Sequence, residues 1–476
     1  MVIRRVLAPR IDFGALRREL ELPEDFPAPA LREAEEAATA PARPAADRTD
    51  IPLVTIDPPT SRDLDQAMCL TRRHGGGYRV QYAIADLTAF VRPGGHLERE
   101  TWRRGQTVYF PDGKVPLHPQ VLSEGVASLL PGVEHAAVLW SIDLDPDGAA
   151  VDVRLERAIV RSRAKLSYSD VQADVEADRV AEPIALLPEI GGLLRSRGIA
   201  RGAVNLPLPE QEVEPSGDGW RLVLRPPVPI EEHNAQISLL TGMAAASIMM
   251  KGGMGLLRTM PAPDPEAVRR LQVAAAGLGI DWPDGMSLGD VMTRIEPGRP
   301  RHAAFLDQAA ELLRGARYTA FHGTVPADPE HGGVAAPYAH VTAPLRRLVD
   351  RYATEVCLAL YAGDPVPDAI REALPALPDV MARTDRIAST AERAAIDLTE
   401  AMVLRGRVGE TFDAAVLDVD RGGSDAGSSR RTGGTIALDD PPVRARCEGE
   451  LPLGERVTVR LEAADPAARR VLFSLV

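Results

Sequence analysis

The chain has 476 residues, 45% of them hydrophobic and 26% charged, which is typical of a globular protein too long for a single core. No apolar run approaches the roughly twenty residues that a membrane span needs, and the three widely spaced cysteines argue against a disulfide framework or a zinc cluster. The net charge of −13 argues mildly against a nucleic-acid partner, although acids around a metal ion can coexist with a basic channel.

The N-terminal third begins with helices and continues with strands. Residues 11–38 have the pattern of short helices, and a Pro/Ala-rich linker follows. The N-terminus lacks the apolar core of a signal peptide, so we expect a cytoplasmic protein. From Ile51 onward the pattern predicts strands at 53–57, 67–70, 75–87, 137–145 and 150–160.

Helices dominate the region beyond Ser167. Apolar periodicity predicts helical segments near 232–251, 264–277, 302–321, 344–361 and 378–405. From about Gly409 the pattern returns to roughly five short strands, which favours a small barrel of the OB type. A Gly/Ser-rich loop within this part carries Arg421, Arg430 and Arg431, candidate contacts for an oligonucleotide, although a disordered linker explains it equally well.

We therefore predict an α+β protein with three parts. Residues 1–48 form a short helical segment and linker, 49–406 a large domain with a mixed sheet and surrounding helices, and 407–476 an OB-fold β-barrel, a fold that commonly binds oligonucleotides.

An acidic stretch, TIDPPTSRDLDQA at 55–67, lies between two predicted strands. Two prolines forbid a regular helix there, so Asp57, Asp63 and Asp65 can converge in an irregular turn. Carboxylates brought together repel one another, and a divalent cation relieves the repulsion. Oxygen-only ligands favour Mg²⁺ or Mn²⁺ over zinc. The alternative is a solvated acidic turn in an acidic protein.

Two further segments carry candidate binding residues. RGQTVYFPDGKVPLHP at 104–119 places Tyr109 before a proline-rich extended stretch. In YAHVTAPLRRLVDRY at 338–352, Pro344 suits the first turn of a helix and Thr342 lies close to its expected cap. Arg346 and Arg347 would then fall in the opening turns, where backbone amides also attract phosphate.

The combination of segments resembles the RNase II (RNB) family of exoribonucleases over roughly residues 22 to 405. The matching segments, in family order, are FPAPALREAEEAA, TIDPPTSRDLDQA, YAIADLTAFVRPGGHLERE, RGQTVYFP with VPLHP, RGAVNLPLPE, IEEHNAQISLLTG, HGGV with PYAHVTAPLRR, and AER at 391–393. The resemblance implies a hydrolytic, Mg²⁺-dependent enzyme that degrades single-stranded RNA from its 3′ end and releases nucleoside 5′-monophosphates. The C-terminal strands are similar to the family's OB-fold RNA-binding domain.

The resemblance also implies roles for individual residues. Asp65, Arg346 and Glu392 match catalytic positions of the family, and Arg346 would hold the scissile phosphate. Tyr109 matches the aromatic residue that packs on the terminal nucleotide. The residues expected to bind metal are Asp57, Asp63, Asp65 and Gln66, and those expected to contact RNA are Tyr109, Leu206, Glu231, Glu232, Thr342 and Arg347. A family glutamate aligns with either Glu231 or Glu232, and the sequence does not choose between them.

Three departures from the family pattern stand out. Gln66 replaces a fourth aspartate, and an amide oxygen can ligate Mg²⁺ without bringing charge, so we expect a higher metal requirement with Mn²⁺ preferred. Leu206 replaces an aromatic residue of the stacking clamp. The short head leaves no room for the cold-shock domains that commonly precede the catalytic domain.

These departures motivate a second hypothesis, an RNA-binding protein of the same fold with weak or lost turnover. A third is an endonuclease or trimming enzyme with a narrow substrate. Single-stranded RNA is the expected partner in each case, with a monomeric protein and no membrane association.

Overall fold

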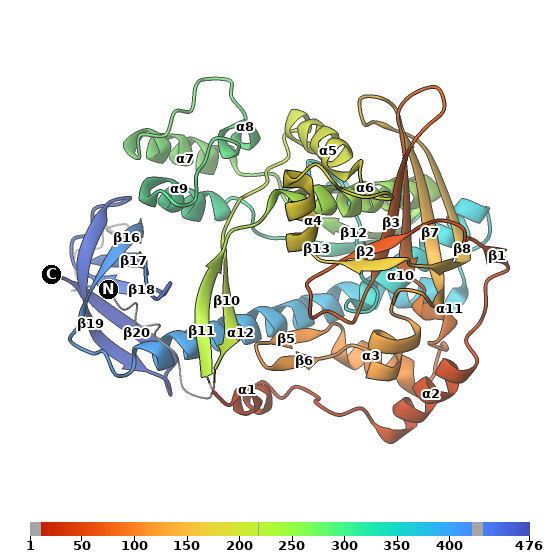
Figure 1. Cartoon of the computed structure of the whole chain (residues 1–476), viewed down its shortest axis with the longest axis horizontal. Helices are drawn as coiled ribbons and strands as arrows, with labels where there is room; N and C mark the ends of the chain where they lie inside the picture. Colours follow the sequence, from red (N-terminus) through yellow and green to blue (C-terminus); the bar gives the residue numbers. More distant parts are fainter. Residues whose placement is uncertain (1–10, 218, 421–431) are drawn as a thin grey trace.

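The protein is described by a computed structural model that covers residues 11–217, 219–420 and 432–476. Its centre is a seven-stranded sheet in the order β1-β8-β7-β4-β3-β2-β9 (Figure 1). Neighbouring strands run antiparallel from β8 to β2, whereas the outer pairs β1–β8 and β2–β9 are parallel. The strands are β1 (Ala46–Asp47), β2 (Val54–Ile56), β3 (Gln66–Arg72), β4 (Tyr78–Ala85), β7 (Glu134–Leu144), β8 (Ala150–Arg161) and β9 (Ala164–Leu166).

Both faces of this sheet are covered, which explains why its central strands are apolar almost throughout. On one face, Trp140 of β7 belongs to the same buried core as Leu240 and Tyr352 from two long helices. On the other face, its neighbour Leu139 packs in a second core with Leu97. The helices concerned are α6 (Pro229–Gly252) and α10 (Leu348–Ala362) on the first face, and α2 (Ala28–Thr39) and α3 (His96–Arg104) on the second.

The remaining helices surround this body. They are α1 (Phe13–Glu19), α4 (Tyr168–Glu176), α5 (Leu187–Arg201), α7 (Pro265–Gly277), α8 (Leu288–Met292), α9 (Pro300–Ala310), α11 (Asp368–Ala373) and α12 (Leu377–Leu404), with short 3₁₀ or π turns at Leu87–Ala89, Leu122–Val126 and Leu374–Ala376. The expected helices near 232–251, 264–277 and 378–405 are confirmed. None of the helices in the described ranges is long and apolar enough to cross a membrane.

The expected helix at 302–321 is wrong in its second half. Helix α9 ends at Ala310, and the chain then forms strand β13 (Arg317–His322), which pairs antiparallel with β12 (Met254–Thr259). Gly315 between them has a φ of +88°, a left-handed conformation that a continuing helix cannot accommodate. Tertiary pairing with β12 therefore overrides the apolar periodicity of this segment.

Three further two-stranded sheets complete the described part of the body. The hairpin β5 (Val108–Phe110) and β6 (Gly113–Val115) lies beside α12, and β14 (Glu330–His331) pairs with β15 (Ala336–Pro337). The hairpin β10 (Glu210–Ser216) and β11 (Gly219–Arg225) falls in the region where we predicted helices to dominate. The N-terminal head packs on these elements, since the buried ring of Phe13 meets Trp220 edge to face at 5.3 Å.

The C-terminal part is a closed five-stranded barrel, consistent with the expected OB fold. Its strands are β16 (Thr411–Val419), β17 (Gly433–Leu438), β18 (Arg444–Glu448), β19 (Arg456–Asp465) and β20 (Arg470–Leu475). The barrel core continues into the end of α12 through Ala401, Val403 and Leu404. The loop with Arg421, Arg430 and Arg431 lies outside the described residues.

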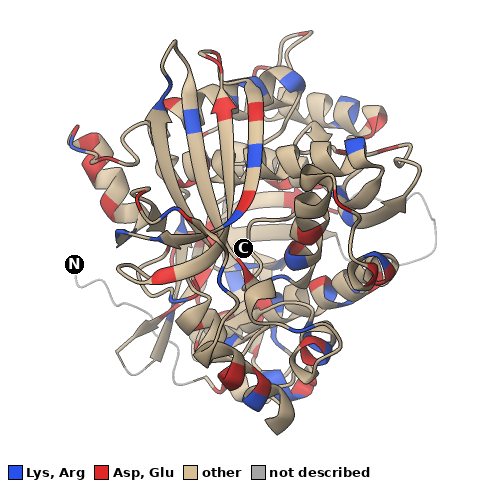
Figure 2. Cartoon of the chain, turned by 90° about the vertical axis from the view of Figure 1, so that its right-hand side faces the viewer, with Lys and Arg blue, Asp and Glu red and all other residues tan. Residues whose placement is uncertain are grey.

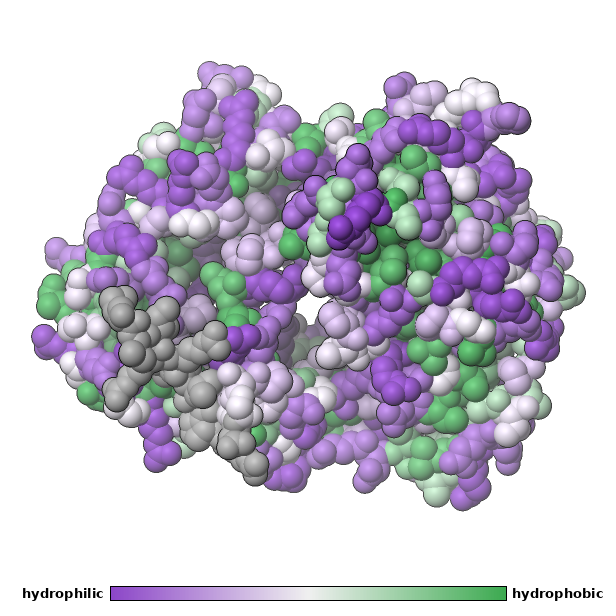
Figure 3. Space-filling model, viewed as in Figure 1, coloured by the Kyte–Doolittle hydropathy of each residue, from purple (hydrophilic) through white to green (hydrophobic). Residues whose placement is uncertain are grey.

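Charged residues of both signs are mixed over the face that presents the large sheet (Figure 2). Figure 3 shows the molecule hollowed near its middle, between the C-terminal barrel and the sheet-containing body. On the face shown in Figure 2, the described residues form no single large charged patch that would mark a binding site.

Candidate active site

The acidic loop connects two strands of the central sheet, and the sheet holds both of its ends. Asp57 follows β2 directly, and its backbone N–H donates to the carbonyl of Leu166 at 3.0 Å. Asp65 directly precedes β3, which pairs with both β2 and β4. The loop between them contains Pro58 and Pro59 and no regular element, as the sequence predicted.

Asp65 is the most buried of the three loop aspartates, with 3% of its surface exposed. Its Oδ1 accepts a hydrogen bond from the backbone N–H of Leu345 at 2.7 Å, and its Oδ2 lies 3.3 Å from Nε of Arg346. Burial raises the pKa of Asp65 to about 7, although the Arg346 charge and the Leu345 N–H act in the opposite direction.

Asp57 and Asp63 differ in what surrounds their oxygens. Oδ2 of Asp57 is buried and has no hydrogen-bond partner in the described part of the chain. Burial raises the pKa of Asp57 to about 6, against the opposing charges of Arg346 and Lys165. Oδ2 of Asp63, in contrast, lies 3.2 Å from the hydroxyl of Tyr109 and 2.9 Å from Nζ of Lys114.

Arg346 lies in a turn and not in a helix, which corrects the expected helix start. Helix α10 begins at Leu348, so Arg346 and Arg347 precede it. The turn is held because the buried carboxylate of Asp350 accepts the Ala343 N–H at 2.6 Å, and Thr107 donates its N–H to the Arg346 carbonyl at 2.9 Å. The Arg346 side chain remains 46% exposed and is free to meet an anion.

Arg347, the second arginine of this segment, makes its contacts within the protein. Arg347 donates to both oxygens of Asp350 at 2.8 Å each, and this ion pair raises the arginine's pKa despite its burial. A guanidinium held in this way fixes the turn and presents Arg346 to the site.

Gln66 contacts the same turn from the opposite side. Its amide nitrogen donates to the carbonyl oxygen of Thr342, a residue with 4% of its surface exposed. The amide nitrogen is therefore engaged with the protein, and only Oε1 of Gln66 could ligate a cation.

A divalent cation fits this arrangement at one end of the loop. In the described ranges, no group of three or more His, Cys, Asp or Glu side chains is placed to hold a metal ion on its own. The partnerless buried oxygen of Asp57, however, would gain a partner from a bound cation, and Arg346 lies close enough to influence both Asp57 and Asp65. Mg²⁺ is commonly bound by one or two carboxylates together with water and substrate phosphate, so Asp57 and Asp65 are a suitable ligand pair.

Two lysines that sequence reasoning missed lie against the acidic loop. Lys114 contacts Asp63, and Lys165 donates to the carbonyls of Pro59 at 2.7 Å and Ser61 at 2.5 Å. The chain has only three lysines, and this scarcity is the sequence feature that could have marked Lys114 and Lys165 as candidate site residues.

Of the predicted RNA contacts, Leu206, Glu231 and Glu232 line a cavity of about 980 Å³, whereas Tyr109, Thr342 and Arg347 are not part of its lining. Leu206 is on its wall, and Tyr168 links the cavity to the acidic loop, since burial and the nearby Asp57 charge raise the tyrosine's pKa to about 12. Both oxygens of Glu231 are bonded within the protein, to Arg225 and to the Val228 N–H.

Glu232 is placed differently at the same cavity wall. Its Oε1 meets Arg195 at 2.8 Å and accepts from Asn205 at 2.9 Å. Its second oxygen makes no hydrogen bond to any described residue and is available to a ligand.

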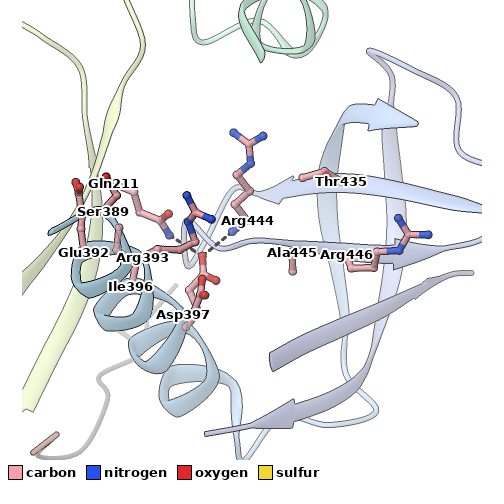
Figure 4. A pocket seen from close by; sticks show the side chains of 11 residues that line it. Gln211, Ser389, Glu392, Arg393, Ile396, Asp397, Thr435, Arg444, Ala445 and Arg446 are labelled. Atoms are coloured by element: carbon pink, nitrogen blue, oxygen red, sulfur yellow. Dashed lines mark hydrogen bonds between the residues drawn. The ribbon is translucent and has the colours of Figure 1, made fainter. Parts of the chain in front are cut away.

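Glu392 lies elsewhere, on α12, and its exposed side chain makes no hydrogen bond or ion pair with the described residues of the acidic loop. It lines a separate cavity of about 550 Å³ between α12, β10 and the barrel (Figure 4). Within that cavity Glu400 accepts from Gln211 at 2.7 Å and from the Arg444 N–H at 2.8 Å.

Comparison with known proteins supports the expected family. A model described as the RNB domain matches residues 46–361, and one described as the RNase II-type exonuclease C-terminal S1 domain matches 410–476. Exosome complex exonuclease RRP44 homolog A of Arabidopsis thaliana is 28% identical over 372 residues, covering 74% of this chain and 39% of the relative. Ribonuclease R of Aquifex aeolicus is 26% identical over 504 residues, covering 98% of this chain and 70% of the relative.

A solved structure has the same fold. Mycoplasma genitalium RNase R in complex with ribose-methylated single-stranded RNA superposes with a TM-score of 0.83 at 17% identity, covering 98% of this chain and 77% of that one. The RNB model alone spans well over half of the sequence and includes the acidic loop and the Arg346 turn. The chain therefore belongs to the RNB-domain family and carries an RNase II-type S1 domain at its C-terminal end.

Proposed function

We propose that the protein is a divalent-metal-dependent exoribonuclease that hydrolyses single-stranded RNA from the 3′ end to nucleoside 5′-monophosphates. The observation that supports it best is the pairing of Asp65 with Arg346 beside the partnerless oxygen of Asp57. Carboxylates for a cation and an exposed arginine for a phosphate are the groups that phosphodiester hydrolysis requires.

The roles follow from these contacts. Asp57 and Asp65 would hold a divalent cation, which would supply an activated water and neutralise phosphate charge. Arg346, preorganised by its turn, stabilises the charge that develops on the non-bridging phosphate oxygens. The half-exposed ring of Tyr109 provides a surface on which a base can stack.

The 980 Å³ cavity is our candidate for the terminal nucleotide. Leu206 offers an apolar contact there, and the unbonded oxygen of Glu232 can accept a hydrogen bond from a ribose 2′-hydroxyl. The other predicted RNA contacts support the site from within the protein. The Glu231 carboxylate is bonded in the cavity wall, and the Thr342 carbonyl and the Arg347 side chain are bonded in the turn that carries Arg346.

The choice of single-stranded RNA rests on two supports. The C-terminal barrel is of a type that binds single strands, and a structural neighbour contains single-stranded RNA. Glu392 and the cavity around it lie between this barrel and the body, where a strand passing from one to the other would contact them.

Incubation with 5′-labelled single-stranded RNA and Mg²⁺ tests the proposal. The expected products are nucleoside 5′-monophosphates and a ladder of shortened 5′-labelled RNA, and EDTA should abolish them. Products with 3′-phosphates, internal cleavage, or activity undiminished by EDTA would contradict it.

A second candidate is an RNA-binding protein with weak or no turnover. It is favoured by the bonds of Gln66 Nε2 to Thr342 and of Asp63 Oδ2 to Lys114, which leave fewer atoms of these two side chains for a metal ion. Binding of the same labelled RNA without any shortening would support this candidate.

A further inference from the structure

Lys114 contacts the acidic loop and lies on the same hairpin as Tyr109. The two residues are direct partners in the antiparallel pair β5–β6, so their side chains lie on the same face. Both reach Oδ2 of Asp63, Tyr109 through its hydroxyl at 3.2 Å and Lys114 through Nζ at 2.9 Å. One aspartate oxygen therefore receives two donors from one hairpin.

A second carboxylate holds the ammonium from the other side. Nζ of Lys114 lies 2.9 Å from Oε1 of Glu124, whose Oε2 accepts from the amide of Gln120 at 2.8 Å. The three charged side chains are 19%, 12% and 13% exposed for Lys114, Asp63 and Glu124. A pair of contacts with so little exposure fixes the ammonium far better than a surface ion pair would.

The use of lysine at this place is unusual within the chain. Arginine supplies nearly all of its 55 basic side chains, and lysine occurs only at 114, 165 and 251. Two of those three contact the acidic loop. An ammonium is a compact point charge, closer in size to a metal ion than the broad guanidinium group is.

The loop aspartates differ in whether their carboxylate oxygens have a partner, and the difference agrees with the position of Lys114. Asp63 has its Oδ2 engaged by Lys114, whereas Oδ2 of Asp57 has no partner among the described residues. Gln66, at the remaining position, brings no charge and bonds Thr342. A divalent cation is therefore needed at the Asp57 end of the loop and not at the Asp63 end.

We propose that Lys114 is a resident cation of the active site, taking the place that a second divalent ion would fill beside Asp63, so that the chain binds one divalent ion. The inference rests on the proposed function for the location of the first ion, but it concerns the number of ions bound and not turnover.

Counting bound Mn²⁺ by electron paramagnetic resonance tests this inference in the full chain. Wild type should bind one Mn²⁺ ion. Lys114→Met should bind a second ion, because Asp63 and Glu124 then lack their fixed positive charge. Lys114→Arg retains the charge and should still bind one, and Lys251→Met, a change at an exposed lysine of α6, should match wild type.

Thermal unfolding gives a second measurement that does not depend on activity. In EDTA the midpoint of Lys114→Met should lie below that of wild type, and saturating Mn²⁺ should raise it by more than it raises wild type. Equal Mn²⁺ stoichiometry and equal Mn²⁺-induced shifts in Lys114→Met and wild type would overturn the inference, as would two ions in wild type.

Failure of the proposed function is distinguishable from failure of this inference. If wild type binds one Mn²⁺ ion and never shortens RNA, the exoribonuclease proposal fails and the role of Lys114 stands. If wild type binds no Mn²⁺, the inference of one bound divalent ion is wrong, whatever number Lys114→Met binds. If neither protein binds Mn²⁺, the inference is wrong.

Discussion

The hydroxyl of Tyr109 donates a hydrogen bond to Oδ2 of Asp63 at 3.2 Å, which ties a ring that is 50% exposed to the acidic loop. The ring face can therefore stack on a base while its polar end is fixed at the proposed reaction site. This contact separates two contributions of the same residue, stacking by the ring and orientation by the hydroxyl.

Tyr109→Ala should weaken binding of single-stranded RNA by about 1–3 kcal/mol, the usual contribution of one stacked base. Tyr109→Phe keeps the ring and should bind RNA nearly as well as wild type. Fluorescence anisotropy in EDTA measures both without cleavage. Equal losses in the two variants would show that the hydroxyl, and not stacking, is what binding requires.

Asp65→Asn should lower the rate of cleavage by at least about 10²-fold, since the loss of one charge removes a cation ligand and an ion-pair partner of Arg346. The asparagine oxygen can still accept the Leu345 N–H, so the turn should persist and RNA affinity in EDTA should be retained. Single-turnover cleavage and anisotropy test the two statements separately. A loss of affinity as large as the loss of rate would instead make Asp65 a structural residue.

In the absence of metal, the contribution of Asp57 and Asp65 to stability should fall as pH rises. Burial raises the pKa of Asp57 to about 6 and that of Asp65 to about 7, so between about pH 4 and 7 the folded chain binds more protons than the unfolded chain. The stabilising contribution of the two protonated carboxyls is thus present at low pH and lost through this window. Mg²⁺ compensates the ionised carboxylates, so its stabilising effect should be largest above about pH 7.

Urea unfolding at several pH values checks this dependence. Asp65→Asn in EDTA should show a shallower decline than wild type between about pH 4 and 7. Burial also raises the pKa of Glu400 to about 7, but that group contributes equally to both proteins and cancels in the comparison. Identical slopes for the two proteins would refute the assignment to Asp65.

Gln66→Met should destabilise the protein by about 1–3 kcal/mol, because the buried Thr342 carbonyl loses its donor while side-chain length is kept. Gln81→Met is a matched control, since Gln81 lies on neighbouring β4 and its side chain makes no hydrogen bond within the described residues. Gln66→Asp should also be destabilised in EDTA but regain stability with Mg²⁺, which can bridge a carboxylate and a carbonyl. Urea unfolding with and without Mg²⁺ measures all three, and equal effects at positions 66 and 81 would exclude a role for the Thr342 contact.

Glu400→Leu should loosen the barrel from the body. Its carboxylate is buried and accepts from Gln211 and from the Arg444 N–H, so a leucine leaves two donors unpaired at a cost of at least about 2 kcal/mol. Glu400→Gln keeps an acceptor oxygen and should be milder. Hydrogen exchange at residues of β18 reports the change, and unaltered exchange in Glu400→Leu would show that other contacts dominate this interface.

Most of the local structure was predictable from the sequence. Strands buried on one face alternate apolar and polar residues, and strands buried on both faces are apolar throughout. The two prolines at 58 and 59 excluded a helix from the acidic loop. The closed barrel was expected, but its strand β18 carries a weak sequence signal, because the arginines at 444 and 446 break the apolar pattern of so short a strand.

Local signals were misleading where a distant element decided the conformation. Residues 317–322 have the periodicity of a helix but pair with β12, some sixty residues earlier in the chain. Pro344 appeared to open a helix, yet the Ala343 N–H bonds to Asp350 and the helix begins only at Leu348. In each case the energy of a tertiary contact exceeds the small difference in local propensity.

The sequence by itself determined the family, the acidic loop, and the set of donors and acceptors available to the site. Only the tertiary structure decided how these groups pair. Asp65 contacts the turn of Leu345 and Arg346, 280 residues further along the chain. Lys114, carried by the β5–β6 hairpin, contacts Asp63, so the acidic loop is not simply solvated. Local composition sets the conformation and charge of a segment, whereas the partner of a carboxylate depends on how separate elements pack, and that packing is a property of the whole fold.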